Sequence, residues 1–400
     1  MSTLLPVTEA LAQVLSGARP PPDPIELPLL DALGHVLAED VISSIAVPPA
    51  DNSAMDGYAL RAGDCGQPLA VSQRIPAGAV GVALEPGTAA RIFTGATVPA
   101  GADCVVMQEN SKEEGGRVTF FGSVQVGQNI RPRGQDIDEG ETVLSRGRLL
   151  RPQDLGLLAS IGCAAVNVYR PLRVAVLSTG DELVEPGSGE PGDGKIYNSN
   201  RYTLGGLLRG INMEFVDCGI VADDPDATAR ALQEAAACAD CIITTGGVSV
   251  GEEDHVKNQV ERLGQLALWK LAIKPGKPLA FGHVDETPFI GLPGNPTSVF
   301  VTFCLIARPF LLKMQGLDET LPPRLWASAE FTVTRPGSRQ EYLRVTLENT
   351  ERGLEANRFP NQSSGVLSSV SHCNALAIIP TGSTVEQGDK VEVLLLDSLA

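Results

Sequence analysis

Three glycine-containing loops are the segments of this sequence best suited to binding a small anion. They are Thr179 to Glu182 after LRVAVLS, Gly246 to Gly251 after CIITT, and Pro293 to Ser298 after PFIGL. Glycine lets backbone N–H groups approach a phosphate, and a helix that starts there favours negative charge. None of the loops is a Walker A or GxGxxG motif, and one alone would more often be a plain strand–helix turn. Occurring together, they favour a phosphate-bearing ligand.

Positive charge for such a ligand is available in the segment WKLAIKPGKP, residues 269–278. It places Lys270, Lys274 and Lys277 within eight residues of a chain whose net charge is −17. If the segment is a strand, Lys270 and Lys274 share one face of it. A solvated sheet edge is the alternative interpretation, but the apolar neighbours and the Pro-Gly turn favour an anion site.

Carboxylates are the other chemical feature near these loops. They come from Glu182, Asp223, Asp224 and Asp254. Grouped carboxylates beside a phosphate indicate a hard divalent cation, and Mg²⁺ is the expected cofactor. Any one of them could instead cap a helix, and Asp223 or Asp224 could cap a helix that starts at Pro225.

The elements that must position these loops alternate between strand and helix over residues 172–315. Continuous apolar strands are expected at 172–178 and 241–247, a further strand at 213–221, and helices at 202–211, 225–239, 254–264 and 297–314. Apolar strands separated by helices predict a parallel sheet covered on both faces. Ligands bind at the carboxyl ends of such strands, which is where the three loops fall.

The remaining segments predict an α/β multidomain protein with additional, smaller domains. A helix is expected over 6–18, capped by Thr8 and ended by Gly17, with further helices in 26–42 and 150–162. Short apolar runs between glycine and proline turns predict strands over 47–145, and strands return after 325. The predicted domains are an N-terminal helical layer or linker (1–46 with 146–170), a β-rich insertion (47–145), the parallel-sheet domain (171–320) and a C-terminal β-barrel-like domain (321–400).

Composition excludes several classes of function. The acidic balance argues against nucleic acid and anionic membranes, since both require clustered Lys and Arg. The N-terminus lacks the features of a signal peptide, and no run of about 18 apolar residues predicts a membrane span, so we expect a cytoplasmic protein. The eight cysteines form no disulfide or zinc pattern, and Cys238 and Cys241 are expected to be buried structural thiols. The histidines are dispersed, and no HExxH, Ser/His/Asp or GxSxG arrangement occurs.

Seven segments together resemble the MoeA and gephyrin E-domain family of molybdopterin molybdenumtransferases. They are DNSAMDGYA, RIFTGATVPAGADCVVMQE, GQNIRPRGQDI, STGDEL, TTGGVSVGEEDH, WKLAIKPGKP and GLPGNPTS. The resemblance runs nearly end to end and implies a molybdopterin-binding parallel-sheet domain in an elongated homodimer. The β insertion of one chain would then face the site of the other.

The resemblance also implies which residues act. The catalytic set would be Asp56, Thr94, Asp136, Glu182, Asp223 and Asp254. Substrate would be bound by Gly246, Gly247, Ser249, Gly251, Lys270, Lys274, Pro293 and Pro296. Glu182 and Asp254 would hold Mg²⁺. Two departures from the family pattern occur, where Gln135 replaces a usual glutamate and residues 362–365 read QSSG in place of a glycine-richer stretch.

The implied reaction inserts molybdate into adenylylated molybdopterin with release of AMP. Expected partners are those two substrates, a second copy of the chain, the enzyme that adenylylates molybdopterin, and the molybdoenzymes that accept the cofactor. Adenylylation of molybdopterin with ATP is a competing hypothesis, although the β insertion and the C-terminal domain favour insertion. A scaffolding role, as in gephyrin, would go with a fused extra domain and a long linker, which this chain lacks. Tungstate is open as an alternative to molybdate.

Overall fold

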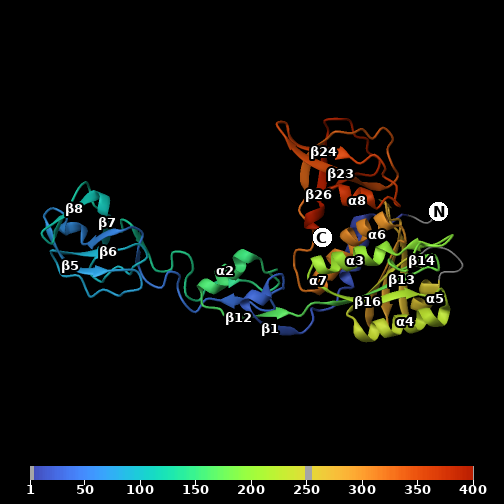
Figure 1. The fold of residues 1–400 in the computed structure, drawn as a ribbon, viewed down its shortest axis with the longest axis horizontal. Coiled ribbons are helices and arrows are strands. Elements are labelled where there is room, and N and C mark those ends of the chain that lie inside the picture. Colours follow the sequence, from blue (N-terminus) through green and yellow to red (C-terminus); the bar gives the residue numbers. More distant parts are fainter. Residues whose placement is uncertain (1–3, 248–254, 400) are drawn as a thin grey trace.

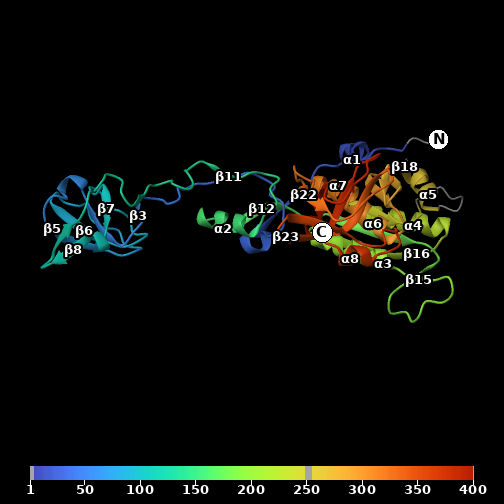
Figure 2. The same ribbon diagram turned by 90° about the horizontal axis from the view of Figure 1, so that it is seen from above.

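The computed structural model describes residues 4–247 and 255–399, and it has an elongated, bent shape. A β-rich lobe lies at one end and is joined through a small lobe to a large α/β body, from which a C-terminal lobe projects sideways (Figure 1). Seen from above, the β-rich lobe is well separated from the body (Figure 2). Residues 47 to 145 therefore leave the small lobe, form a distant lobe, and return.

The α/β body contains a six-stranded sheet in the order β16-β13-β17-β21-β20-β18. Its strands are β13 (Arg173–Thr179), β16 (Glu214–Val221), β17 (Cys241–Thr245), β18 (Gly264–Lys270), β20 (Pro278–Val284) and β21 (Thr287–Leu292). The first four strands in this order run parallel, as the apolar runs predicted. Strands β20 and β18 pair antiparallel at one edge, so the sheet is mixed rather than wholly parallel.

Helices cover both faces of this sheet and bury a separate apolar core on each. One core joins α1 (Val7–Ser16), α3 (Ser199–Gly210), α6 (Pro296–Thr302) and α7 (Arg308–Met314), whereas the other joins α4 (Pro225–Cys238) and α5 (His255–Leu263). A π-helical turn, Phe303–Ala307, links α6 to α7. The whole segment Pro296–Met314 is long and apolar enough to cross a membrane, but 89% of its most apolar window is buried within the protein, as expected of a core helix.

Two helix-end predictions can be compared with α1. Gly17 is the C-terminal cap, as predicted. Thr8 is not the N-terminal cap, because the helix begins one residue earlier, after Pro6, and no side chain caps it. Proline fixes the backbone angle that a helix entry needs, so the helix can begin there without a capping hydroxyl.

The small lobe differs most from the sequence prediction. Residues 26–42, expected to be helical, form β1 (Pro24–Pro28), a 3₁₀ turn (Leu29–Ala32) and β2 (Val41–Ile42). Strand β1 pairs with β12 (Ala165–Tyr169), and β2 with β11 (Thr142–Leu144). The prolines at positions 24 and 28 disfavour helix, and the partner strands lie more than a hundred residues away, where a local pattern cannot reveal them. The predicted helix in 150–162 is present as α2 (Pro152–Ser160).

The distant lobe is built on a six-stranded sheet in the order β7-β4-β6-β5-β9-β8. Its strands are β4 (Gly57–Leu60), β5 (Leu69–Ile75), β6 (Thr88–Ile92), β7 (Cys104–Met107), β8 (Ser111–Glu114) and β9 (Arg117–Phe120). Where the chain enters and leaves the lobe, β3 (Asn52–Ser53) pairs with β10 (Ile130–Arg131). The two crossings are thereby held side by side.

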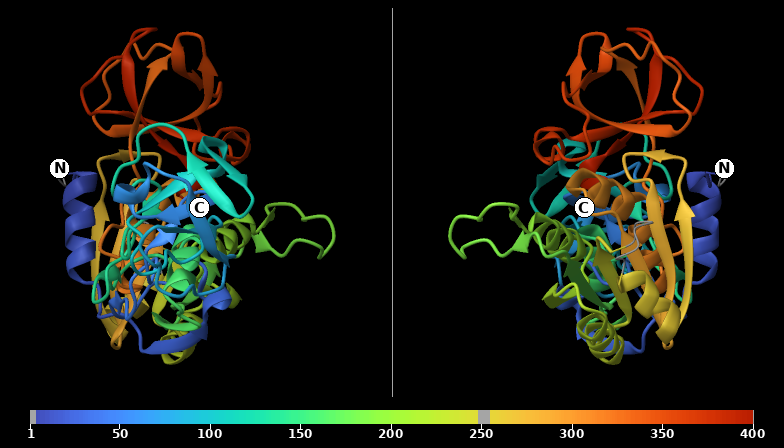
Figure 3. Two further views of the ribbon diagram at one scale, coloured as in Figure 1. Left: turned by 90° about the vertical axis from the view of Figure 1, so that its left-hand side faces the viewer. Right: turned by 90° about the vertical axis from the view of Figure 1, so that its right-hand side faces the viewer.

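The C-terminal lobe is a closed five-stranded barrel, visible end-on in Figure 3. It contains β22 (Leu325–Ala329), β23 (Gln340–Thr350), β24 (Gly353–Arg358), β25 (Ala375–Ile379) and β26 (Lys390–Leu395), with the short helix α8 (Ser368–His372) beside them. Pairing of β23 with β25 closes the barrel. Strand β19 (Ile273–Lys274) leaves the body and pairs with β23, which ties the barrel to the body.

Candidate active site

A cavity of about 680 Å³ opens where the α/β body meets the C-terminal barrel. Its walls come from the carboxyl ends of β13, β17 and β21, from the start of α3, and from the segment that crosses to the barrel. The ends of parallel strands leave backbone and side-chain groups free for a ligand, because the following helices turn away from the sheet there. This is the place that the three loops in the sequence predicted.

Gly246 and Gly247, the described residues of the loop after β17, have little room for a side chain. Gly246 and Gly247 both have positive φ, 84° and 65°, which favours glycine. A Cβ on Gly246 would lie 3.1 Å from the main-chain oxygen of Thr179, and one on Gly247 would lie 2.5 Å from Cγ2 of Val256. A Cβ on Gly294 would lie 3.8 Å from Cα of Gly246. The loops at the three strand ends are therefore in close contact.

The charged residues around the cavity are mostly positive. Among the described residues that line it, Lys274, Lys277 and Arg339 are cationic and Glu182 is the one carboxylate. Lys274 Nζ lies 3.0 Å from an oxygen of Glu341, and Arg339 donates a hydrogen bond of 3.1 Å to the main-chain oxygen of Ile273. These contacts hold both side chains at the rim. Even with Lys274 paired to Glu341, the charges at the cavity remain positive on balance in an acidic protein, which suits an anion.

The structure brings together one of the catalytic and metal-binding residues inferred from the sequence, Glu182, and several of the inferred substrate-binding residues. Glu182, Gly246, Lys274, Pro293 and Pro296 line one cavity, and Gly247 lies directly beside Gly246.

Lys270 and Lys274 do not share a strand face, contrary to the prediction. Lys270 ends β18 opposite Pro278, the chain then turns, and Lys274 pairs with Glu341 of β23. Of these two lysines, only Lys274 lines the cavity. The reason is tertiary, because the barrel supplies a new partner strand at residue 273.

Two neighbouring aspartates between β16 and α4 have different surroundings. Asp224 caps α4, and its carboxylate accepts a hydrogen bond of 2.8 Å from the main-chain N–H of Ala227. Asp223 does not cap the helix, and its main-chain N–H donates a 3.4 Å hydrogen bond to the carboxylate of Asp181. Asp223 does not line the cavity. Of the two aspartates that the sequence offered as caps for the helix at Pro225, Asp224 is therefore the cap.

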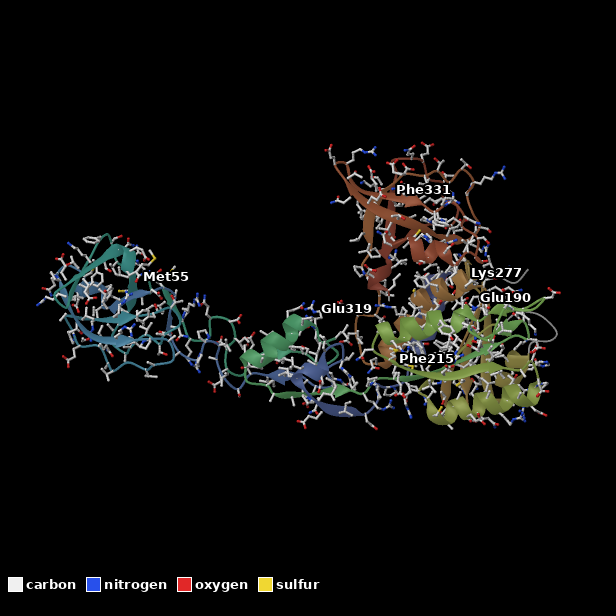
Figure 4. All side chains as sticks on the ribbon, in the orientation of Figure 1. Met55, Glu190, Phe215, Lys277, Glu319 and Phe331 are labelled. Carbon is white, nitrogen blue, oxygen red and sulfur yellow. The ribbon has the colours of Figure 1, made fainter. Side chains whose placement is uncertain are left out.

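Asp56, Thr94 and Asp136 lie away from this cavity within one chain. Figure 4 shows Met55, the neighbour of Asp56, in the distant lobe, and Lys277 in the body beneath the barrel. Oδ1 of Asp56 accepts hydrogen bonds of 2.8 Å from both the main-chain N–H and the hydroxyl of Thr94. These two bonds, helped by the charge of Arg91, lower the pKa of Asp56 below its ordinary value. Asp136 lies where the chain returns from the lobe, and its N–H donates to the main-chain oxygen of Val47.

Three of the predicted residues, Ser249, Gly251 and Asp254, lie outside the described residues. In the described part of the chain, no cluster of three or more His, Cys, Asp or Glu side chains could hold a metal by itself. Cys238 is exposed and Cys241 is buried, so the prediction of two buried thiols is correct only for Cys241.

Sequence reasoning missed two walls of the cavity. One belongs to the C-terminal barrel and consists of Arg339, Gln362, Ser363 and Ser364. The other is the run Asn198-Ser199-Asn200 at the start of α3. The polar run before an apolar helix was the available signal for the second wall. Nothing local in the sequence indicates that residues 339 and 362 line the same cavity as residue 274.

Comparison with known proteins identifies the family. The sequence matches the models for the MoeA N-terminal region (domain I and II) over residues 5–162, a probable molybdopterin binding domain over residues 175–313, and the MoeA C-terminal region (domain IV) over residues 327–396. It is 40% identical over 382 residues to the molybdopterin molybdenumtransferase of Haemophilus influenzae, covering 94% of each chain. Its identity to the molybdopterin molybdenumtransferase of Nostoc is 37%, over 91% of this chain and 87% of the relative.

A solved structure agrees with these matches. The molybdopterin biosynthesis MoeA protein from Pyrococcus horikoshii has a TM-score of 0.87 and 33% identity, covering 98% of this chain and 100% of that chain. The protein therefore belongs to the MoeA family, and the predicted resemblance is confirmed. It is accordingly an enzyme, a molybdopterin molybdenumtransferase of molybdenum cofactor biosynthesis.

Proposed function

We propose that the enzyme takes adenylylated molybdopterin as its substrate, inserts molybdate, and releases AMP with the help of Mg²⁺. The single observation that carries this proposal is the cavity itself, which lies at the ends of parallel strands and is lined by three cations and one carboxylate. Adenylylated molybdopterin and molybdate are both anions. A site for both needs several fixed positive groups to offset their repulsion.

The residues present fit a magnesium ion that is held partly by its substrate. Mg²⁺ is commonly bound by one or two carboxylates together with substrate phosphates. Glu182 supplies one carboxylate in the cavity, and phosphate oxygens of the substrate would supply further ligands. When bound, the ion would stabilise negative charge that develops on the phosphate oxygens as AMP leaves. Asp254 is retained in the proposal as a second ligand from the sequence motif.

The chain's own residues would bind and orient the two substrates. The main-chain N–H of Gly247 and the side chain of Lys277 would bind phosphate, and Lys274 would hold molybdate. A molybdate oxygen would attack the molybdopterin phosphate as its bond to AMP breaks and AMP leaves. The two dithiolene sulfurs, losing their protons, would then displace that oxygen from molybdenum and leave it on the phosphate. Because positioning and electrostatics contribute most to such phosphoryl chemistry, no covalent nucleophile from the protein is required.

We infer that a second copy of the chain completes the site with its Asp56–Thr94 pair. Within one chain this pair belongs to the lobe at the far end of the molecule (Figures 1 and 4). The connecting small lobe exposes a set of large apolar side chains that suits self-association. These are Leu30 (84% exposed), Ile42 (59%), Leu33 (48%) and Leu149 (40%).

All eight cysteines are unpaired, which fits the reducing cytoplasm as the compartment in which the enzyme works.

The decisive experiment is an AMP-release assay with purified protein, adenylylated molybdopterin, molybdate and Mg²⁺. The proposal expects release that requires both molybdate and Mg²⁺. Tungstate in place of molybdate would measure the selectivity between the two oxyanions. If the protein instead forms adenylylated molybdopterin from ATP and releases no AMP on addition of molybdate, the proposed reaction is wrong and the preceding step is the function.

Mixing two inactive variants tests the contribution of the second copy. Asp56→Asn and Glu182→Gln change different lobes, so a mixed dimer contains one site with neither change. We expect each variant alone to be inactive and the mixture to recover up to about a quarter of wild-type activity if subunits exchange freely and at random. No recovery in a mixture shown to contain mixed dimers would contradict a shared site.

A further inference from the structure

Two buried oxygen atoms in the wall of the cavity have no hydrogen-bond partner among the described residues. They are Oδ1 of Asn200, at the start of α3, and Oγ1 of Thr245, at the end of β17. Buried polar atoms in folded proteins nearly always have a hydrogen-bond partner, because an atom that loses its hydrogen bonds to water on burial and forms no new one destabilises the fold. Three other buried atoms in the described chain are also unpaired, but these two lie in the wall of one cavity, where a ligand can pair with them.

The geometry fixes what Asn200 can offer. Its amide nitrogen donates a 2.7 Å hydrogen bond to the main-chain oxygen of Gly294, in the loop after β21. This bond orients the side chain, so the unpaired atom is the carbonyl oxygen, which only accepts hydrogen bonds. Thr245 is 2% exposed, and its hydroxyl can accept a bond or donate one.

The position of both residues selects the part of the substrate that they meet. The cationic side chains of the cavity come from the crossing segment and the barrel, whereas Asn200 and Thr245 belong to the sheet ends and α3. The anionic groups of the substrate would be held by the cations. The neutral end of a molybdopterin is its pterin, whose pyrimidine edge carries two neighbouring N–H donors, the 2-amino group and N3–H. The unpaired oxygens of Asn200 and Thr245 can accept hydrogen bonds from these two neighbouring N–H groups.

We propose that Asn200 and Thr245 recognise the pterin through its 2-amino and N3–H groups and thereby set the specificity for a 2-amino pteridine. The proposal rests on the proposed function for the identity of the substrate. It assigns both as binding residues, with no part in bond making or breaking. The proposal also explains why a threonine occupies position 245. A valine would fill the same space without burying an unpaired hydroxyl, so the hydroxyl needs a role.

Thr244 provides a matched control one residue away. It is fully buried on the same strand, and its hydroxyl also has no partner among the described residues. Consecutive strand residues face opposite sides of a sheet, so Thr244 faces the core of α4 and α5, whereas Thr245 faces the side of α3 and α6. Thr244 does not line the cavity. Thr244→Val and Thr245→Val therefore make the same chemical change on the two sides of the sheet.

The test is a fluorescence titration of the full-length protein with pterin-6-carboxylate and with lumazine-6-carboxylate, in which oxygen replaces the 2-amino group. We expect the wild type and Thr244→Val to bind the pterin about 5- to 100-fold more tightly than the lumazine, the effect of one buried hydrogen bond. Because lumazine keeps N3–H, this preference should fall to about twofold or less in whichever of Thr245→Val and Asn200→Ala removes the partner of the 2-amino group, and the other variant should weaken the binding of both probes alike. Thermal unfolding should show Thr245→Val to be at least as stable as the wild type, so that a lost preference cannot be attributed to misfolding.

Two results would overturn the inference. One is a wild type that does not prefer the pterin, including one that binds neither probe. The other is a preference that survives in both Thr245→Val and Asn200→Ala. Neither titration involves molybdate, Mg²⁺ or turnover. A normal pterin preference without AMP release would therefore contradict the proposed reaction alone, and normal AMP release with no preference would contradict this inference alone.

Discussion

Replacement of Gly247 by alanine would test whether close packing at the strand ends maintains the site. Its φ of 65° costs an alanine about 1–2 kcal/mol. The added Cβ would also lie 2.5 Å from Cγ2 of Val256 and 3.0 Å from Oγ1 of Thr179. Overpacking of this kind costs a further amount of about 1–3 kcal/mol. We therefore expect Gly247→Ala to lower the free energy of unfolding by about 2–5 kcal/mol.

The control for this prediction is Gly219→Ala in the same body. Gly219 has a φ of 68°, and nothing lies within 4 Å of the position of an added Cβ. It should therefore cost only the backbone contribution, about 1–2 kcal/mol. Denaturant unfolding followed by the fluorescence of Trp269, which stacks on Phe281 in the body, would measure both variants. Equal losses in the two variants would refute the packing argument and leave backbone conformation as the whole cost.

Three further outcomes are expected. Asp56→Asn and Glu182→Gln should each abolish AMP release with little loss of stability, since both carboxylates lie in polar loops; normal turnover in both would remove these residues from the site. Thr94→Val should raise the pKa of Asp56 towards its ordinary value, because one of two hydrogen bonds to the ionised form is lost, and an NMR titration that shows no rise would contradict this. Burial raises the pKa of Asp240, but it is outweighed by the combined effect of two hydrogen bonds from Arg170, of 2.7 and 2.8 Å, a 2.7 Å hydrogen bond from the main-chain N–H of Arg173, and the charges of both arginines, so the pKa is lowered overall. The stability from this pair should therefore be present at neutral pH and be lost as the pH falls from the ordinary aspartate range through the lowered pKa. Asp240→Asn should destabilise the body by about 1–3 kcal/mol at pH 7 and remove that part of the acid dependence, and an unchanged acid profile would contradict the prediction.

The α/β body was largely predictable because its signals are local. The apolar strands 172–178, 213–221 and 241–247 and the helices between them appear close to their predicted positions as β13, β16 and β17 and α3 and α4. A strand buried on both faces must be continuously apolar, and a helix between such strands must be amphipathic, so each element can be recognised without its neighbours. The glycine loops followed from the same reasoning, since parallel strands end at one edge.

Predictions failed where a partner from a distant part of the chain decided the structure. Residues 26–42 form strands because β12 and β11 pair with them, and Lys274 leaves the face of Lys270 because β23 pairs with residue 273. Backbone hydrogen bonds between strands do not depend on sequence separation, so no local pattern reports them. The antiparallel edge formed by β18 and β20 was missed for the same reason.

The sequence by itself therefore determined the family, the α/β class, and the loops that lie at the ends of the parallel strands. The tertiary structure alone decided that the barrel supplies Arg339 and Gln362 to the cavity and that Asp56 lies in a distant lobe. It also decided that the oxygens of Asn200 and Thr245 in the cavity wall have no partner among the described residues. The physical reason is that composition and periodicity reflect which side of each segment is buried and which is exposed to water, together with its contacts to residues nearby in the sequence. The contents of a cavity between domains depend instead on how whole domains pack, which no single segment encodes.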